Sequence, residues 1–164
     1  MAGDVYLKLT DHDGESTDSA HKGEIEILSY SAGVSMPVST RSTSGSATVE
    51  KASLSDLSLT KLTDASSAAL FKSSCQGSHI KEAILSVNRA DGKGGKVEYL
   101  KYTLGDVVIS SYQVSGSDGG GVPVESFALN FANIKIEYKP TDPATGEAKG
   151  SKSGGWDVAA NKPL

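Results

Sequence analysis

The amino-acid sequence predicts a mainly β fold, an antiparallel domain of about eight or nine strands with a single α-helix. Three observations favour this class: most segments alternate apolar and polar residues, one alternating run is unusually long, and only one segment has helical periodicity. All five prolines lie outside the interiors of the expected strands, as sheet hydrogen bonding requires. At 164 residues the chain fits one domain, 1–164, and is long enough to bury a core.

The longest alternating run covers residues 124–139. Its apolar residues stand at odd positions up to Phe131 and at even positions from Ile134 onward. A one-residue slip in register turns a side chain to the other sheet face. The run therefore predicts either a β-bulge near Ala132 and Asn133 or a strand that packs against two surfaces in turn. Since strands usually run about 3–10 residues, a strand this long and bent is typical of a strongly curved sheet or a barrel.

Shorter alternating runs predict the other strands, at 5–9, 24–34, 49–62, 81–89, 97–104 and 106–114. A polar, glycine-containing loop is expected over 11–22, and Asp91 with Gly92 favours a hairpin turn between two of the strands. The run 24–34 changes parity as well, because Leu28, Tyr30 and Ala32 carry its later apolar bulk. The tail is expected to be loop until 156–158.

One segment, at about 64–76, predicts a helix. Asp64 offers an N-cap and Gly77 a C-terminal stop. At about 100° per residue, one face carries four small or apolar residues that we expect to dock on the sheet: Ala65, Ala68, Phe71 and Cys75. Leu70 falls roughly opposite this face, so its burial would require a second partner.

Composition and motifs argue against several classes of function. A net charge of −4 without a basic block disfavours nucleic-acid binding and binding to anionic membranes. The single cysteine, Cys75, allows neither an intrachain disulfide nor a thiolate metal cluster, and on the apolar helix face it is expected to be a small core residue. No apolar run is long enough for a membrane span, and the N-terminus is unlike a secretory signal peptide.

The sequence offers no catalytic or metal-binding set. His12, His21 and His79 lack the spacing of zinc ligands, and we expect them to be solvated or hydrogen-bonded surface residues. No G-x-S-x-G motif occurs. A Ser/His/Asp site assembled from distant loops would leave no mark in the sequence, because triads are defined by geometry. We therefore expect no enzyme activity, no cofactor and no metal.

Five stretches resemble the haemolysin-coregulated protein (Hcp) family, the tube protein of bacterial type VI secretion. They are GESTDSAHKGEIEILSYS (14–31), GSHIKEAILSVNRA (77–90), EYLKYTLGDVVISSYQVSG (98–116), FALNFANIKIEYKP (127–140) and GWDVAANK (155–162). The match is collinear over nearly the whole chain.

The resemblance implies a compact antiparallel β-barrel with a flanking helix, of which six copies close into a ring. Rings would stack into a hollow tube that leaves the cell inside a contractile sheath, tipped by a spike trimer, with small effector proteins held in the ring lumen. The protein would be made in the bacterial cytoplasm and secreted without a signal peptide. Because the chain stops shortly after the family's terminal A-N-K, no C-terminal effector extension is expected. The alternative function is a free-ring effector chaperone or receptor that forms no tube, and an enzyme ranks third.

Strand parity and the helix face, taken together with the resemblance, assign roles to particular residues. Ser29 and Ser31 are expected to face the lumen and its cargo, with Tyr30 against the barrel core; outer solvent is the alternative for Ser31. Leu70 is the expected residue of the subunit interface. The long Ser/Thr/Gly-rich loop 34–46 is expected to reach along the tube axis toward the next ring, anchored by its apolar residues: Val34, Met36, Pro37 and Val38.

Overall fold

The computed structural model describes residues 4–39 and 49–164. Within these ranges the chain forms eleven strands and one helix, in the order β1 (Asp4–Leu9), β2 (Ile25–Ile27), β3 (Ser29–Ser31), β4 (Val34–Ser35), β5 (Ser53–Leu54), β6 (Leu57–Leu62), α1 (Ser67–Gln76), β7 (Ile80–Ala90), β8 (Lys96–Ser115), β9 (Val124–Tyr138), β10 (Lys152–Asp157) and β11 (Lys162–Pro163). All strand pairs are antiparallel. The mainly β class with one helix is therefore confirmed.

Strand pairing returns on itself and makes a barrel. β1 pairs with β2 and β7, β7 pairs with β8, β8 with β9, β9 with β6, and β6 with β3. β2 and β3 are consecutive parts of one run, separated only by Leu28, whose N–H donates a hydrogen bond to the carbonyl oxygen of Thr60 at 2.8 Å. This junction joins the two ends of the strand order β2-β1-β7-β8-β9-β6-β3, so these seven strands form one circuit.

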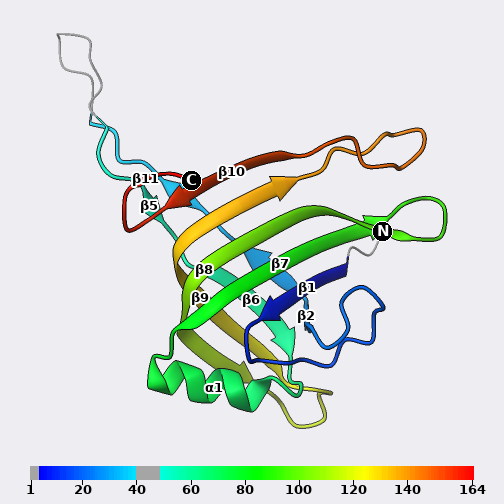
Figure 1. Ribbon diagram of the computed structural model, residues 1–164. Coiled ribbons are helices and arrows are strands. Elements are labelled where there is room, and N and C mark those ends of the chain that lie inside the picture. Colours follow the sequence, from blue (N-terminus) through cyan, green and yellow to red (C-terminus); the bar gives the residue numbers. More distant parts are fainter. Residues whose placement is uncertain (1–3, 40–48) are drawn as a thin grey trace.

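The two longest strands each serve two surfaces. β9 pairs with β6 from Val124 to Leu129 and with β10 from Asn133 to Tyr138. Its buried positions change parity between Phe131 and Ile134, so the predicted strand that packs against two surfaces in turn is confirmed. The 15 residues of β9 curve together with the neighbouring β8 (Figure 1).

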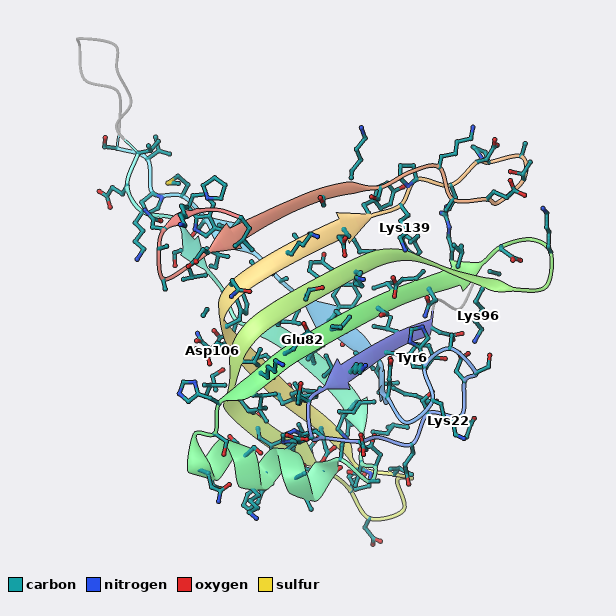
Figure 2. The ribbon with its side chains drawn as sticks, viewed as in Figure 1. Tyr6, Lys22, Glu82, Lys96, Asp106 and Lys139 are labelled. Atoms are coloured by element: carbon teal, nitrogen blue, oxygen red, sulfur yellow. The ribbon has the colours of Figure 1, made fainter. Side chains whose placement is uncertain are left out.

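β8 is one strand of 20 residues where two were expected, at 97–104 and 106–114. Its backbone bends at Asp106, which has φ 49, and Figure 2 shows Asp106 at this bend, near the helix. Gly105 stands opposite Asn133, and a Cβ on Gly105 would lie 2.5 Å from the Asn133 Oδ1. At this bend the side of each strand that faces the core changes. The buried residues Leu104 and Val107 of β8 have opposite parity, and they pair with Ile134 and Phe131 of β9, where the same change occurs.

The expected strand 24–34 is divided into β2, β3 and β4. Leu28, predicted to share a buried parity with Tyr30, is instead 60% exposed. Tyr30 packs against the core as expected. The reason is the change of partner from β1 to β6 at Leu28, because this residue occupies the junction and points away from the interior. Ala32 is also exposed.

The helix docks with a different face from the one predicted. α1 lies across one end of the barrel (Figure 1), and within it only Leu70 is buried. Phe71 is 58% exposed and Cys75 is also exposed, so their expected burial is wrong. Ala65 and Ala68 are exposed too, so the whole predicted face points to solvent, and the helix docks through Leu70 on its opposite side. The C-terminal stop is confirmed, because Gly77 is left-handed with φ 61.

Candidate functional site

One exposed face of the barrel wall is made almost entirely of short, uncharged side chains. It covers β3, β6, β9 and the C-terminal part of β8, whose alternate residues point into the core. We call it the polar face, and its members are Ser29, Ser31, Ser58, Thr60, Ser111, Gln113, Ser126, Ala128 and Asn130. Ser29 pairs with Thr60 and Ser31 with Ser58, so the two serines that the sequence singled out lie together on this face.

Hydrogen bonds within the polar face occupy part of its polar groups. The hydroxyls of Ser29 and Thr60 are hydrogen-bonded to each other. At the border, Asp56 accepts a hydrogen bond from the Ser110 hydroxyl at 2.6 Å and another from the Asn130 amide at 2.9 Å. The Asp56 carboxylate beside this face therefore has both oxygens occupied.

An apolar groove opens at one end of these strands, between the β4–β5 hairpin and the sheet of β8, β9 and β10. Its cavity volume is about 480 Å³, and the side chains that define it here are Val34, Met36, Leu54, Ile136 and Trp156. In Figure 1, β5 lies beside β10 and β11 at this end of the molecule. We call this cavity the apolar groove.

The expected ring-stacking residues are only partly loop residues. Val34 belongs to β4, pairs with Leu54 and is 68% exposed. Val38 forms an isolated bridge with Val49, and the Pro37 carbonyl accepts a hydrogen bond from the Glu50 N–H at 3.1 Å. The described part of the expected loop 34–46 is thus the start of a paired hairpin, and residues 40–46 lie outside the described residues.

A second exposed apolar group lies at the other end of the same strands. Leu28, Leu62 and Val122 meet there, beside the carboxylates of Glu15 and Glu26. Leu62 is the last residue of β6, and Val122 is 56% exposed in the connection before β9. We call these three residues the apolar patch.

Leu70 is not available to a neighbouring subunit. Its exposed fraction is 0% within the single chain, where it belongs to the main hydrophobic core. The burial that suggested a second partner is supplied by the barrel itself, so the assignment of Leu70 to a subunit interface is wrong.

A buried charged cluster joins the helix to the barrel. The Lys61 ammonium contacts Glu125 at 2.5 Å and Asp64 at 2.7 Å, and its side chain is 0% exposed. Ser67, the first residue of α1, donates to Glu125 at 2.8 Å, and the Tyr112 hydroxyl also donates to Glu125. Burial and this carboxylate raise the pKa of Tyr112 to about 12, because both disfavour the phenolate.

Asp64 connects this cluster to the start of the helix. Its Oδ1 accepts hydrogen bonds from the Ser66 N–H at 2.9 Å and from the Ser66 hydroxyl at 2.5 Å. The N-cap is therefore Ser66 and not Asp64 as predicted, and Asp64 instead holds the turn that precedes the helix.

The three histidines are hydrogen-bonded, and one of them is not a surface residue. His12 is buried, with its two ring nitrogens 2.7 Å from the Thr10 carbonyl oxygen and 2.8 Å from the Ser73 hydroxyl. His21 stacks on Tyr6 with ring centroids 4.5 Å apart. His79 is exposed and contacts Asp106 at 2.7 Å.

The described residues, 4–39 and 49–164, offer neither a metal site nor a membrane-spanning helix. No group of three His, Cys, Asp or Glu side chains there is arranged to hold a metal ion. None of the described helices is long and apolar enough to cross a membrane.

Comparisons with known proteins agree with this geometry. A family model described as type VI secretion system effector, Hcp, matches residues 6–138. The protein hcp1 of Pseudomonas aeruginosa is 35% identical over 166 residues, covering 98% of each chain. The chain belongs to the Hcp family. Its members are secreted tube proteins of type VI secretion, not a family of enzymes.

Solved structures support the same assignment. One described as a type six secretion system protein superposes with a TM-score of 0.92 at 33% identity, covering 99% of this chain and 100% of that one. Hcp1 from Salmonella typhimurium superposes with a TM-score of 0.81 at 34% identity, covering 100% of both chains. The fold and family predicted from the sequence are therefore confirmed.

Proposed function

We propose that this chain is the structural subunit of a type VI secretion tube, in which hexameric rings stack into a hollow tube and the polar face lines the lumen. The polar face carries the proposal. It is exposed, built from short side chains and held on a closed barrel, whereas the exposed apolar residues gather at the two ends of its strands. A subunit wall with this distribution can contact neighbours at its ends and leave the polar face open.

The chemistry of the polar face suits a wall that holds cargo and releases it. Large apolar patches mark sites of lasting association, and among the described residues of this face, away from the strand ends, half-buried Val108 opposite Asn130 is the one apolar side chain larger than alanine. Hydroxyl and amide groups that already have partners, such as Ser29 and Asn130, gain little from a new hydrogen bond. Small effector proteins would be held by many weak contacts along this surface. The spike trimer and the contractile sheath are the further partners that membership of the family suggests.

Ring stacking is proposed for the hairpin that begins at β4. Val34 and Met36 are exposed, and Pro37 and Val38 continue away from the barrel into the expected loop. In this arrangement the hairpin of one ring contacts the next ring along the tube axis. The alternative, a free ring that receives effectors without stacking, would use the same polar face.

The first experiment is native mass spectrometry of the purified protein, with electron microscopy of the same sample. We expect six subunits and stacked rings. A monomer at micromolar concentration would contradict the proposal, whereas single rings without tubes would favour the free-ring chaperone.

The second experiment tests the polar face. Ser31→Gln should keep the hexamer and lower the cellular level of an effector held in the lumen, because the longer side chain crowds the cargo. Ser19→Gln, at an exposed serine of the 11–22 loop, is the matched control. Intact rings with unchanged effector levels would place Ser31 outside the lumen.

A further inference from the structure

The apolar patch and the apolar groove lie at opposite ends of the same strands. Along the β3 segment the chain passes from Leu28 in the patch, through Ser29 and Ser31, to Val34 in the groove. Those six steps span about 20 Å at ~3.3 Å per residue. β6 confirms the direction, because it ends at Leu62 in the patch while the preceding β5 lines the groove. The polar face lies between the two.

Both surfaces expose large apolar side chains to solvent. Leu28 is 60% exposed at the patch, and Ile136 is 40% exposed in the groove. The patch lines a hollow of about 200 Å³, and the groove is a cavity of about 480 Å³. The two surfaces therefore match in apolar character, with Leu28 as the most exposed side chain that the patch offers.

The charges beside the two surfaces are of opposite sign. Glu26, exposed on β2, borders the patch together with Glu15. Lys152 of β10 has the same strand parity as Gly154 and Trp156, which line the groove, so it extends the groove face. Within residues 4–39 and 49–164, neither Glu26 nor Lys152 takes part in an ion pair.

We propose that the apolar patch of one subunit docks against the Ile136 and Trp156 side of the apolar groove of a second copy of this chain, as the lateral contact around the ring, which leaves Val34 and Met36 on the other side of the groove to the stacking contact. This inference rests on the proposed ring and names the surfaces that close it. A contact between two different surfaces repeats from copy to copy and closes when the rotation fits, whereas a patch that met itself would stop at a dimer. Self-pairing would also bring the Glu26 carboxylates of the two copies together, which costs free energy.

The decisive experiment uses two variants that each destroy one side of the contact. Leu28→Asp damages the patch and keeps the groove; Ile136→Asp damages the groove and keeps the patch. Each alone should be monomeric in analytical ultracentrifugation. Mixed in equal amounts they should form a dimer and nothing larger, because one intact contact remains between them. Phe71→Asp on the helix, at an equally exposed position, is the control and should keep the ring.

A second pair of variants avoids the risk of misfolding. Glu26→Lys and Lys152→Glu each place like charges across the proposed contact. Each should raise the subunit concentration needed for ring formation by at least tenfold. The double variant restores opposite charges and should recover most of the loss. Circular dichroism checks that every variant is folded.

The outcomes separate this inference from the proposed function. If the unmodified protein forms no ring, the proposed function fails. If it forms rings and Leu28→Asp and Ile136→Asp also form rings, the lateral contact assigned here is wrong while the ring stands. Variants that keep single rings but lose stacked tubes would move the contact to the junction between rings and overturn the lateral assignment. Monomeric variants that do not dimerise when mixed would also overturn it.

Discussion

Replacing Lys61 with methionine should destabilise the subunit strongly. The methionine side chain keeps most of the apolar length of the lysine and removes its charge. In the native protein the ammonium contacts Glu125 and Asp64 and donates to the Leu62 carbonyl at 3.0 Å and to Ser67 at 3.2 Å. Without the ammonium, the Glu125 side chain, 1% exposed, keeps only the hydroxyls of Ser67 and Tyr112 as donors.

The magnitude follows from this burial. Removing one partner of a buried ion pair leaves an uncompensated charge and typically costs about 3–5 kcal/mol. An exposed pair is worth only about 0–1 kcal/mol. Lys101, which contacts Glu137 at 3.4 Å in a partly exposed setting, therefore offers a matched control. Lys101→Met should cost less than about 1 kcal/mol.

Urea unfolding, followed by Trp156 fluorescence and circular dichroism, measures both free energies. Every variant is compared at one subunit concentration, because assembly contributes to apparent stability. The midpoint should fall for Lys61→Met with an unchanged slope. Adding Glu125→Gln should recover part of the loss, since the stranded charge is then removed. Equal losses for Lys61→Met and Lys101→Met would refute the reasoning.

Three further outcomes are expected. Leu70→Ala should cost about 2–5 kcal/mol of unfolding free energy, whereas the same change at exposed Phe71 should cost far less; equal losses would mean that the helix docks differently. The native pKa of Tyr112 is raised above its unfolded value of about 10, so the contribution of Tyr112 to the free energy of unfolding should be fully present below pH ~10 and be lost between pH ~10 and 12. Tyr112→Phe should remove this pH dependence in alkaline unfolding titrations. Gly14→Ala should lower the melting temperature, at a cost of about 1–3 kcal/mol, because its Cβ would lie 2.5 Å from a backbone carbonyl oxygen; Gly105→Ala, which meets a rotatable side-chain amide, should cost less.

Most of the fold prediction rested on strand parity, the alternation of apolar and polar residues along each strand. The change of parity between Phe131 and Ile134 was readable because large apolar side chains stand on both sides of it. The strand β10 was missed for the converse reason. Gly154 and Gly155 occupy its middle and have no side chains to alternate, so the sequence predicted only 156–158.

The buried charged cluster, whose residues are absent from the predicted sites, has a signature in the sequence. Lys61 continues the parity of Leu57 and Leu59, and Glu125 continues that of Phe127. Two opposite charges on buried positions of two strands indicate a buried pair. The polar face was partly predicted through Ser29 and Ser31, but its extent depends on which strands become neighbours, and local sequence does not determine that.

The closure of the barrel at Leu28 has a consequence for the timing of amide hydrogen exchange. The junction residue donates the backbone hydrogen bond to Thr60 that carries the circuit from β2 to β3, and its own side chain belongs to the apolar patch. A solvent-exposed hydrogen bond at a junction is among the first to open. In an isolated subunit, the Leu28 amide should therefore exchange with deuterium early. A neighbour seated on the patch would slow that exchange, so a single amide would report whether the molecule stands alone or beside another copy.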